Sequence, residues 1–325
     1  MLVPVLLFLV GFVLLIKGGD WFVDGSVGIA RRFHLPELLI GATIVSIGTT
    51  LPEVMVSSQA ALQGNAGISY GNAIGSIICN TSLIAAITIT ASPSKVQPRS
   101  FVLPTAFFFA AAASYALIAW TMGRFQRWMG LAYLAVFVLY MVVSTMQMKK
   151  HPEMAEENAE EESGEKERSF AMELLLLVIG AAAIALGARF LVDNGTKIAA
   201  ALGVPDSVIG LTMVALGTSL PELITAITSL LKGHGSLSLG NIIGANLFNI
   251  VLVSGAAISI SPFAIPTEKT VMGGVNSSMV IDLPVMLAVM MIMCLPALKK
   301  GELRRWQGVL LLTIYAAFTV YQFVS

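Results

Sequence analysis

Long runs of apolar residues dominate the chain and are separated by short polar stretches. A helix needs about 20 apolar residues to cross the hydrocarbon layer of a membrane. Because an unpaired backbone cannot face lipid, each such run is expected to be helical. Ten runs qualify, at 2–25, 37–62, 68–91, 101–121, 127–147, 169–192, 206–231, 237–260, 278–298 and 304–324. The pattern therefore predicts an all-α polytopic membrane protein with ten transmembrane helices.

The composition agrees with that prediction and excludes several other classes of protein. Of the 325 residues, 56% are hydrophobic and only 12% are charged, about half the charged share of a soluble domain. The net charge is zero and no basic, aromatic-rich stretch occurs, which excludes a nucleic-acid partner. Cys79 and Cys294 lie far apart in apolar runs, so neither a disulfide framework nor a zinc site is expected. We expect no cofactor and no obligatory protein partner; the lipid bilayer is the expected surrounding.

One strongly polar stretch, Lys149 to Ser169, divides the chain near its middle. Its Glu-rich composition predicts a solvated linker. The expected organisation is a first five-helix unit (1–148), an acidic linker (149–168) and a second five-helix unit (169–325). If the linker is cytoplasmic, the loops on its side hold thirteen Lys and Arg residues, against four on the other side. The positive-inside rule then predicts a cytoplasmic linker and two extracellular termini.

An internal repeat relates the two units. A shift of 169 residues places IGATIVSIGTTLPE (40–53) on IGLTMVALGTSLPE (209–222) and GNAIGSIICN (71–80) on GNIIGANLFN (240–249), without a gap. Across residues 40–80, 17 of 41 positions are identical to their counterparts. Five spans is an odd number, so the second copy is predicted to lie upside down relative to the first. Inverted repeats with interrupted helices near the midplane are typical of secondary transporters.

Each repeat carries a proline and a carboxylate inside an apolar run. Pro52 and Pro221 have no amide hydrogen, so each is expected to open its helix near the preceding Gly48 or Gly217. Helical spacing places four residues of each copy on one face: Ser46, Thr49, Thr50 and Glu53, then Ala215, Thr218, Ser219 and Glu222. The following span of each copy adds a second stripe: Asn72, Ser76 and Asn80, then Asn241, Ala245 and Asn249.

If the inverted halves meet at their pseudo-two-fold axis, these four helices enclose one pocket in which Glu53 and Glu222 face each other. An intramembrane carboxylate is costly and is a functional candidate by default. The repeated motifs supply two carboxylates and many neutral oxygens but no His, Cys or Lys ligand, which indicates a hard cation. Calcium takes six to eight oxygens with flexible geometry, whereas zinc and copper prefer softer ligands. Without calcium, the two acids should hold a proton or sodium ions, because they repel each other and are desolvated.

Other polar residues are interpreted as structural. Lys17, Asp20 and Asp24 lie on one helix face, and Arg189 precedes Asp193 by four residues; these are expected to be paired charges near a membrane boundary. The GxxxG spacings of Gly71 with Gly75 and of Gly240 with Gly244 predict close helix packing. The three histidines fall in loops and are expected to be solvated: His34, His151 and His234.

The two GTxLPE boxes and the two GNxxGxxxxN boxes resemble the alpha repeats of the sodium/calcium exchangers in the calcium:cation antiporter superfamily. The resemblance covers nearly the whole chain. It implies a secondary antiporter of the cell membrane that exchanges sodium ions for calcium by alternating access, with net charge movement. It also implies that Glu53 and Glu222 bind calcium together with the carbonyls of Thr49 and Thr218. The implied sodium ligands are Ser46 (through its carbonyl), Thr50, Ser76, Asn80, Ala215 (through its carbonyl), Ser219 and Asn249.

This chain departs from the family pattern at two positions. Archaeal members often carry Ser where this chain has Ala245, so one sodium site lacks a hydroxyl. Potassium-dependent relatives typically carry Asp where this chain has Asn249, and the asparagine favours potassium-independent exchange.

Three other functions are weighed against sodium/calcium exchange. A proton/calcium exchanger would use the same paired glutamates, but relatives of that type carry an acidic residue soon after GN, where this chain has Gly75 and Gly244. A passive channel could bind the same ions, although the inverted repeat favours alternating access. An intramembrane hydrolase would need a nucleophile with a His or Asp partner at depth, and no span centre holds a histidine, so an enzyme is not expected.

Overall fold

The computed structural model describes residues 2–150, 168–202, 215–267, 270–271 and 275–324. Helices form nearly all of the described part of the first unit: α1 (Leu2–Arg32), α2 (Glu37–Ile40), the π-helix η1 (Gly41–Val45), α3 (Ser46–Leu62), α4 (Ala66–Cys79), the π-helix η2 (Asn80–Ala85), α5 (Ala86–Ala91), α6 (Pro98–Met122) and α7 (Arg127–Lys150). The second unit contributes α9 (Phe170–Ala201), α11 (Ala215–Thr218), α12 (Leu220–Leu231), α13 (Gly235–Phe248), the π-helix η4 (Asn249–Ser254), α14 (Gly255–Ile260), the π-helix η5 (Ser278–Asp282), α15 (Leu283–Lys300) and α16 (Arg305–Val324).

In the described part of the chain, four two-residue strands lie in the connections. The strand β1 (Ser94–Lys95) pairs antiparallel with β4 (Glu302–Leu303), and β2 (Thr270–Val271) pairs with β3 (Val275–Asn276). The first pair ties the loop before α6 to the loop before α16.

Eight helices in the described part of the chain are long and apolar enough to cross a membrane, and Leu220–Leu231 is an apolar helix of shorter length. The prediction of an all-helical polytopic membrane fold is therefore confirmed. Most of the predicted linker (149–168) and the start of the predicted span 206–231 lie outside the described residues, as does His151. The helices α1 and α9 extend beyond the predicted ends at 25 and 192. The added segments include two charged residues with partners, since Arg32 bonds Glu173 and Asp193 pairs with Arg189.

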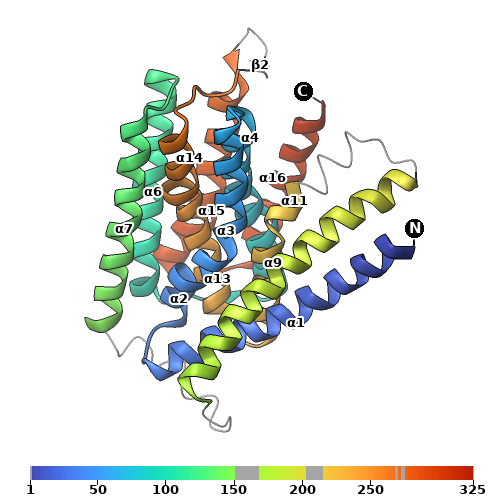
Figure 1. Cartoon of the computed structure of the whole chain (residues 1–325). Coiled ribbons are helices and arrows are strands. Elements are labelled where there is room, and N and C mark those ends of the chain that lie inside the picture. The colour runs from blue at the N-terminus through green and yellow to red at the C-terminus, as the bar shows by residue number, and fades with distance from the viewer. Residues whose placement is uncertain (1, 151–167, 203–214, 268–269, 272–274, 325) are drawn as a thin grey trace.

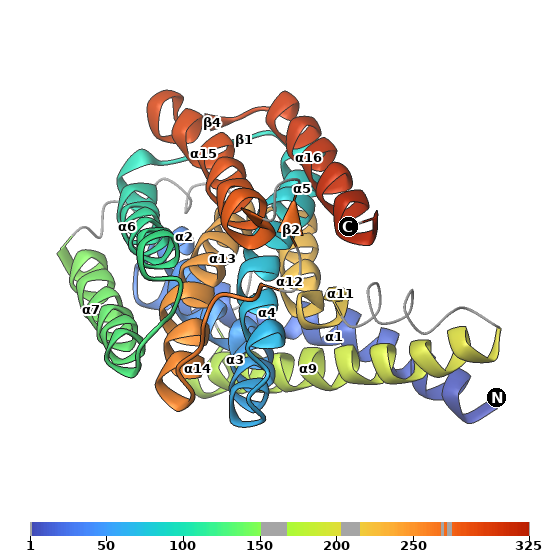
Figure 2. The same cartoon turned by 90° about the horizontal axis from the view of Figure 1, so that it is seen from above.

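The two longest helices, α1 and α9, lie side by side and extend obliquely beyond the rest of the bundle (Figures 1 and 2). Glycines permit this close approach. A Cβ on Gly18 would lie 2.9 Å from the backbone nitrogen of Ile184, and one on Gly187 would lie 2.9 Å from that of Leu15. Small residues at such contacts let helix backbones pack closely inside a membrane.

The central helices repeat the same structure at the shift seen in the sequence. The elements α4, η2 and α5 have the same lengths and boundaries as α13, η4 and α14 when 169 is added to each residue number. The turns before them also match, since Gly64 and Gly233 both have positive φ, at 73° and 84°. Figure 2 shows α3, α4, α12 and α13 at the centre, with α6, α7, α15 and α16 around them.

The two GxxxG motifs have different surroundings. On α13, a Cβ at Gly240 would lie 2.8 Å from the carbonyl carbon of Leu38, and one at Gly244 would lie 2.6 Å from Cα of Ala42. On α4, apart from the adjacent backbone of that helix and the chain neighbours, no atom of the described residues lies within 4 Å of such a Cβ at Gly71 or Gly75, and Gly71 is exposed. Close packing is therefore confirmed for the second motif, whereas the first motif makes no such contact within the described part.

Candidate ion-binding site

The helix α3 presents the first polar face that the sequence predicts. Ser46, Thr49, Thr50 and Glu53 are all buried, and Glu53 is fully inaccessible to solvent. The π-helix η1 ends immediately before Ser46, and π-turns inside longer helices are frequent at functional sites. α3 itself continues through Pro52. The predicted interruption at this proline is therefore wrong for the first repeat: Pro52 is accommodated within α3, and the irregularity, η1, ends at Val45, about two turns earlier.

The second repeat is interrupted as predicted. Ser219 separates α11 from α12, with φ −89° and ψ 3°, and Pro221 occupies the first turn of α12, where its missing amide hydrogen costs no helical bond. Glu222 also lies in that first turn. The helix dipole favours negative charge there. Ala215 begins α11 and Thr218, which is half-buried, ends it.

Glu53 and Glu222 meet in the interior. The two carboxylates lie close enough to repel each other when both are ionised. The hydroxyls of Thr49 and Thr50 approach Glu222. Even so, both carboxylate oxygens of Glu53 and both of Glu222 have no hydrogen-bond partner among the described residues. Two unpaired carboxylates at complete burial are strongly unfavourable. The pair therefore requires a bound cation or proton.

Another buried acid in the same protein shows the contrast. The carboxylate of Glu173 on α9 accepts hydrogen bonds from Arg32, at 2.8 Å from Nε and 3.1 Å from Nη2. The guanidinium of Arg32 balances the negative charge of Glu173, whereas Glu53 and Glu222 have no basic partner among the described residues.

Two asparagines from the central helices complete the buried polar surface. Asn80 and Asn249 are the first residues of the π-helices η2 and η4, and both are fully buried. Asn249 donates its Nδ2 hydrogen to the carbonyl of Ala245 at 3.0 Å, and this leaves its Oδ1 without a partner in the described part of the chain. The side-chain atoms of Asn80 are likewise unpartnered there, as are the hydroxyls of Thr50 and Ser219. Ser76, one turn before Asn80, is buried.

Asn72 and Asn241 form hydrogen bonds that connect the central helices around the site. Asn72 donates from Nδ2 to the carbonyl of Glu53 at 3.2 Å. Asn241 accepts from the Thr49 hydroxyl at 3.1 Å through Oδ1, and from the Ser46 hydroxyl at 3.0 Å through its backbone carbonyl. The sequence pattern placed both asparagines in the pocket-lining stripes. Their observed bonds show that they connect neighbouring helices.

The sequence interpretation missed several polar contacts between the two units, and two of them involve His234 and Asn246. His234, expected to be solvated, has Nδ1 at 2.9 Å from Oε1 of Glu37, with only 15% of its side chain exposed. Asn246 donates from Nδ2 to the Thr81 hydroxyl at 2.8 Å. Neither has a counterpart at the shift of 169 residues, where Asn65 and Ile77 stand, so the repeat gave no signal for them.

The donor set suits a hard cation. Among the residues that the structure describes, no group of three or more His, Cys, Asp or Glu side chains could hold a metal ion. The site consists instead of two carboxylates surrounded by hydroxyl, amide and carbonyl oxygens. Calcium and sodium accept such ligands, and zinc or copper do not prefer them.

Comparisons with known proteins give consistent results. The family model for the sodium/calcium exchanger protein matches residues 3–146 and 172–324. The sodium/calcium exchanger MaX1 of Methanosarcina acetivorans is 32% identical, with 98% of each chain covered. An uncharacterised membrane protein of Methanocaldococcus jannaschii, MJ0091, is 34% identical over 95% of this chain and 94% of the relative.

The fold is also similar to solved structures. One of the sodium-calcium exchanger NCX_Mj, soaked with sodium and strontium ions, matches with a TM-score of 0.80 at 32% identity and covers 97% of both chains.

Proposed function

This chain belongs to the sodium/calcium exchanger family, and from that premise we propose that it is a secondary antiporter that exchanges sodium ions for calcium across the cell membrane by alternating access. The observation that carries the proposal is the pair of fully buried, unpartnered carboxylates, Glu53 and Glu222. Relatives named as sodium/calcium exchangers support it over nearly their full length.

Calcium binds between Glu53 and Glu222 in this proposal, with the carbonyls of Thr49 and Thr218 as further ligands. The two negative charges balance one divalent ion, which removes the repulsion between the carboxylates. Neutral oxygens then complete the six to eight ligands that calcium takes, at about 2.3 to 2.6 Å.

Sodium ions occupy the same pocket in the alternate step. Their proposed ligands are Ser46, Thr50, Ser76, Asn80, Ala215, Ser219 and Asn249. The unpartnered oxygens of Thr50, Ser219 and Asn249 support this assignment. The Ser46 hydroxyl lies 2.7 Å from the Gly41 carbonyl and 3.0 Å from the Asn241 carbonyl, which is consistent with Ser46 binding an ion through its own carbonyl.

The proposed architecture is ten transmembrane helices in two inverted five-helix repeats, 1–148 and 169–325, joined by the linker 149–168. Matching boundaries of α4, η2 and α5 with α13, η4 and α14 support the repeat. In Figure 1, α4 begins near the top of the bundle and α13 near the bottom, which supports the inversion. The distribution of Lys and Arg supports a cytoplasmic linker and extracellular termini.

The exchange moves net charge if more than two sodium ions replace one calcium ion. Each elementary charge that crosses the membrane is then worth about 2.3 kcal/mol per 100 mV. A membrane potential that is negative inside would therefore help to expel calcium from the cell. We expect the protein to need no cofactor and no obligatory protein partner.

Calcium-45 uptake into proteoliposomes tests the function. An outward sodium gradient should drive uptake, and collapse of that gradient should stop it. Uptake that depends on a proton gradient alone would replace this proposal with proton/calcium exchange by the same glutamates. Calcium flux that needs no counter-ion would indicate a channel instead.

A further inference from the structure

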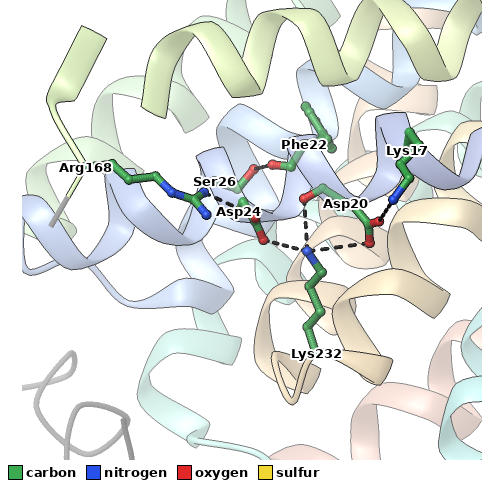
Figure 3. A network of polar contacts seen from close by, with 7 residues as sticks. All are labelled: Lys17, Asp20, Phe22, Asp24, Ser26, Arg168 and Lys232. Atoms are coloured by element: carbon green, nitrogen blue, oxygen red, sulfur yellow. Dashed lines mark hydrogen bonds and ion pairs between the residues drawn. The ribbon is translucent and has the colours of Figure 1, made fainter. Parts of the chain in front are cut away.

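A group of charged side chains joins α1 to the end of α12 (Figure 3). Lys232, the residue that follows α12, has its Nζ 2.6 Å from Oδ1 of Asp24 and 3.5 Å from Oδ1 of Asp20. The same Nζ donates to the backbone carbonyl of Asp20 at 3.2 Å. One lysine from the second unit thus bridges two acids of the first unit.

Arg168 and Lys17 extend the group. Nη1 of Arg168 lies 3.2 Å from Oδ2 of Asp24, on the side opposite Lys232 (Figure 3). Among the residues that the structure describes, Lys17 pairs only with Asp20 of its own helix, at 3.9 Å, and its side chain is 61% exposed. The side chains of Lys232 and Asp24 are 29% and 30% exposed. The bridge made by Lys232 to Asp20 and Asp24 is called the charge latch below, and the face of the molecule that bears it, near Arg168, is called the linker face.

The charge latch acts on the helix that carries Glu222. Lys232 lies directly after α12, and Glu222 lies in the first turn of that helix. Close packing of the two helices accompanies this ion pair, since a Cβ on Gly19 of α1 would lie 2.7 Å from Oγ1 of Thr228 and 2.8 Å from Cγ2 of Ile224 on α12. The helix α1 is therefore joined at the linker face to α12, the helix that carries Glu222.

The first unit has no counterpart of the latch in the described part of the chain. A shift of 169 residues replaces Lys232 by Gln63, Asp24 by Asp193 and Asp20 by Arg189. Gln63 is exposed, and Asp193 pairs within its own helix with Arg189, at 3.6 Å. Within the described residues, α9 is therefore not joined to the end of α3 by an ion pair as α1 is joined to the end of α12.

The packing of the central helices is also tighter for α13 of the second unit than for α4 of the first. Gly240 and Gly244 are buried against Leu38 and Ala42, whereas Gly71 is exposed. Ser46 adds a hydrogen bond to the carbonyl of Asn241, and its counterpart is Ala215, which has no hydroxyl. The contacts between units are therefore tight where α2, α3 and α13 meet, just beyond the charge latch.

We propose that Lys232, with Asp20 and Asp24, holds the linker face closed and so biases this exchanger toward the state that opens at the opposite face. The inference rests on the proposed function, because it assigns a direction to alternating access. Lys232 binds no ion in this role. It contributes only to the relative stability of the two states.

The latch has opposite effects at the two faces. When the state open to the linker face is rare, apparent affinity measured there is lowered by the fraction of that state. Weakening the latch raises this fraction. The calcium concentration needed for half-maximal exchange should then fall at the linker face and rise slightly at the other face. General damage to the fold would instead weaken transport from both faces.

Three variants test the latch. Lys232→Gln converts the residue to its counterpart in the first unit, Lys232→Arg keeps the charge, and Lys17→Gln removes a charge that stays within α1. The calcium concentration for half-maximal exchange is measured at each face in vesicles of one orientation. Lys232→Gln should lower the half-maximal calcium concentration at the linker face about three- to fivefold, as expected for the loss of a partly exposed ion pair. At the other face, the half-maximal calcium concentration should be equal or higher. The Lys232→Arg and Lys17→Gln variants should behave like the wild type.

Hydrogen exchange on the purified protein provides a readout that does not require transport. Amides at 13–27 and 228–240 should exchange faster in Lys232→Gln but not in Lys17→Gln. Equal half-maximal concentrations in Lys232→Gln and wild type at both faces, or unchanged exchange in these segments, would overturn the latch. A wild-type protein that fails to exchange sodium for calcium would instead refute the proposed function, and the hydrogen-exchange comparison would still decide the latch.

Discussion

The two GxxxG motifs permit a matched experiment on one contact between the units. Gly244→Ala adds a methyl group that would lie 2.6 Å from Cα and 2.7 Å from the carbonyl oxygen of Ala42, where ordinary contacts lie at 3.4–4 Å, and it would also press against Oγ of Ser46. The helices must separate by about 0.8 Å (3.4 minus 2.6) to accept it. Backbone shifts forced by such overpacking cost about 1–3 kcal/mol.

Gly75→Ala is the control at the equivalent position, 169 residues earlier. Apart from the adjacent backbone of α4 and the chain neighbours, no described atom lies within 4 Å of its new methyl group. Both substitutions gain the same helix propensity, about 1 kcal/mol. The difference in unfolding free energy between the variants therefore reports the contacts of position 244 with Ala42 and with the Ser46 hydroxyl, and we expect Gly244→Ala to be less stable than Gly75→Ala by about 1–3 kcal/mol.

Unfolding of the purified protein in mixed micelles, followed by circular dichroism against denaturant, measures this difference. Gly244→Ala should also reduce calcium exchange, because the linker face can no longer close fully, while Gly75→Ala retains it. Equal stability of the two variants would refute the view that the second motif alone packs closely.

Three further predictions concern the ion site and its surroundings. Glu53→Gln or Glu222→Gln should reduce calcium-45 exchange to near background, because one of the two charges that balance calcium is lost. Gel filtration should still show a folded monodisperse protein, because the size of the side chain is kept. Wild-type exchange in either variant would contradict the shared site. Ala245→Ser should change the sodium dependence of exchange and leave the calcium dependence nearly unaltered, and an effect on calcium alone would contradict the sodium assignment. Arg32→Gln should lower the unfolding free energy by about 1–3 kcal/mol, because it leaves the carboxylate of Glu173 buried without its cation; unchanged stability on denaturant titration would show that this pair contributes nothing.

The repeat made much of the site predictable from the chain alone. Apolar runs of sufficient length must become helices in lipid, because every backbone hydrogen bond has to be satisfied within the segment. The duplicated GTxLPE and GNxxG boxes then selected Glu53 and Glu222 among 19 acidic residues, and both carboxylates are fully buried. Helical spacing also predicted correctly that Thr49, Thr50 and Glu53 lie on one buried face.

The local response to proline was only half predictable. Both copies carry the same Leu-Pro-Glu sequence, yet α3 continues through Pro52 whereas Ser219 interrupts the helix before Pro221. A proline removes one hydrogen bond in either case. Whether the helix then bends or breaks depends on its neighbours, and these differ between the two copies.

The sequence by itself determined the helical membrane fold, the duplication and the two acids, since these follow from local hydropathy and from residue types at repeated spacings. Only the tertiary structure decided that Gly240 and Gly244 pack against Leu38 and Ala42, that His234 pairs with Glu37 and that Lys232 bridges Asp20 and Asp24. Such contacts join residues about 200 positions apart in the chain, and they exist only once the two units have come together. A repeated sequence cannot specify them, because the two copies share their motifs and differ in what surrounds them.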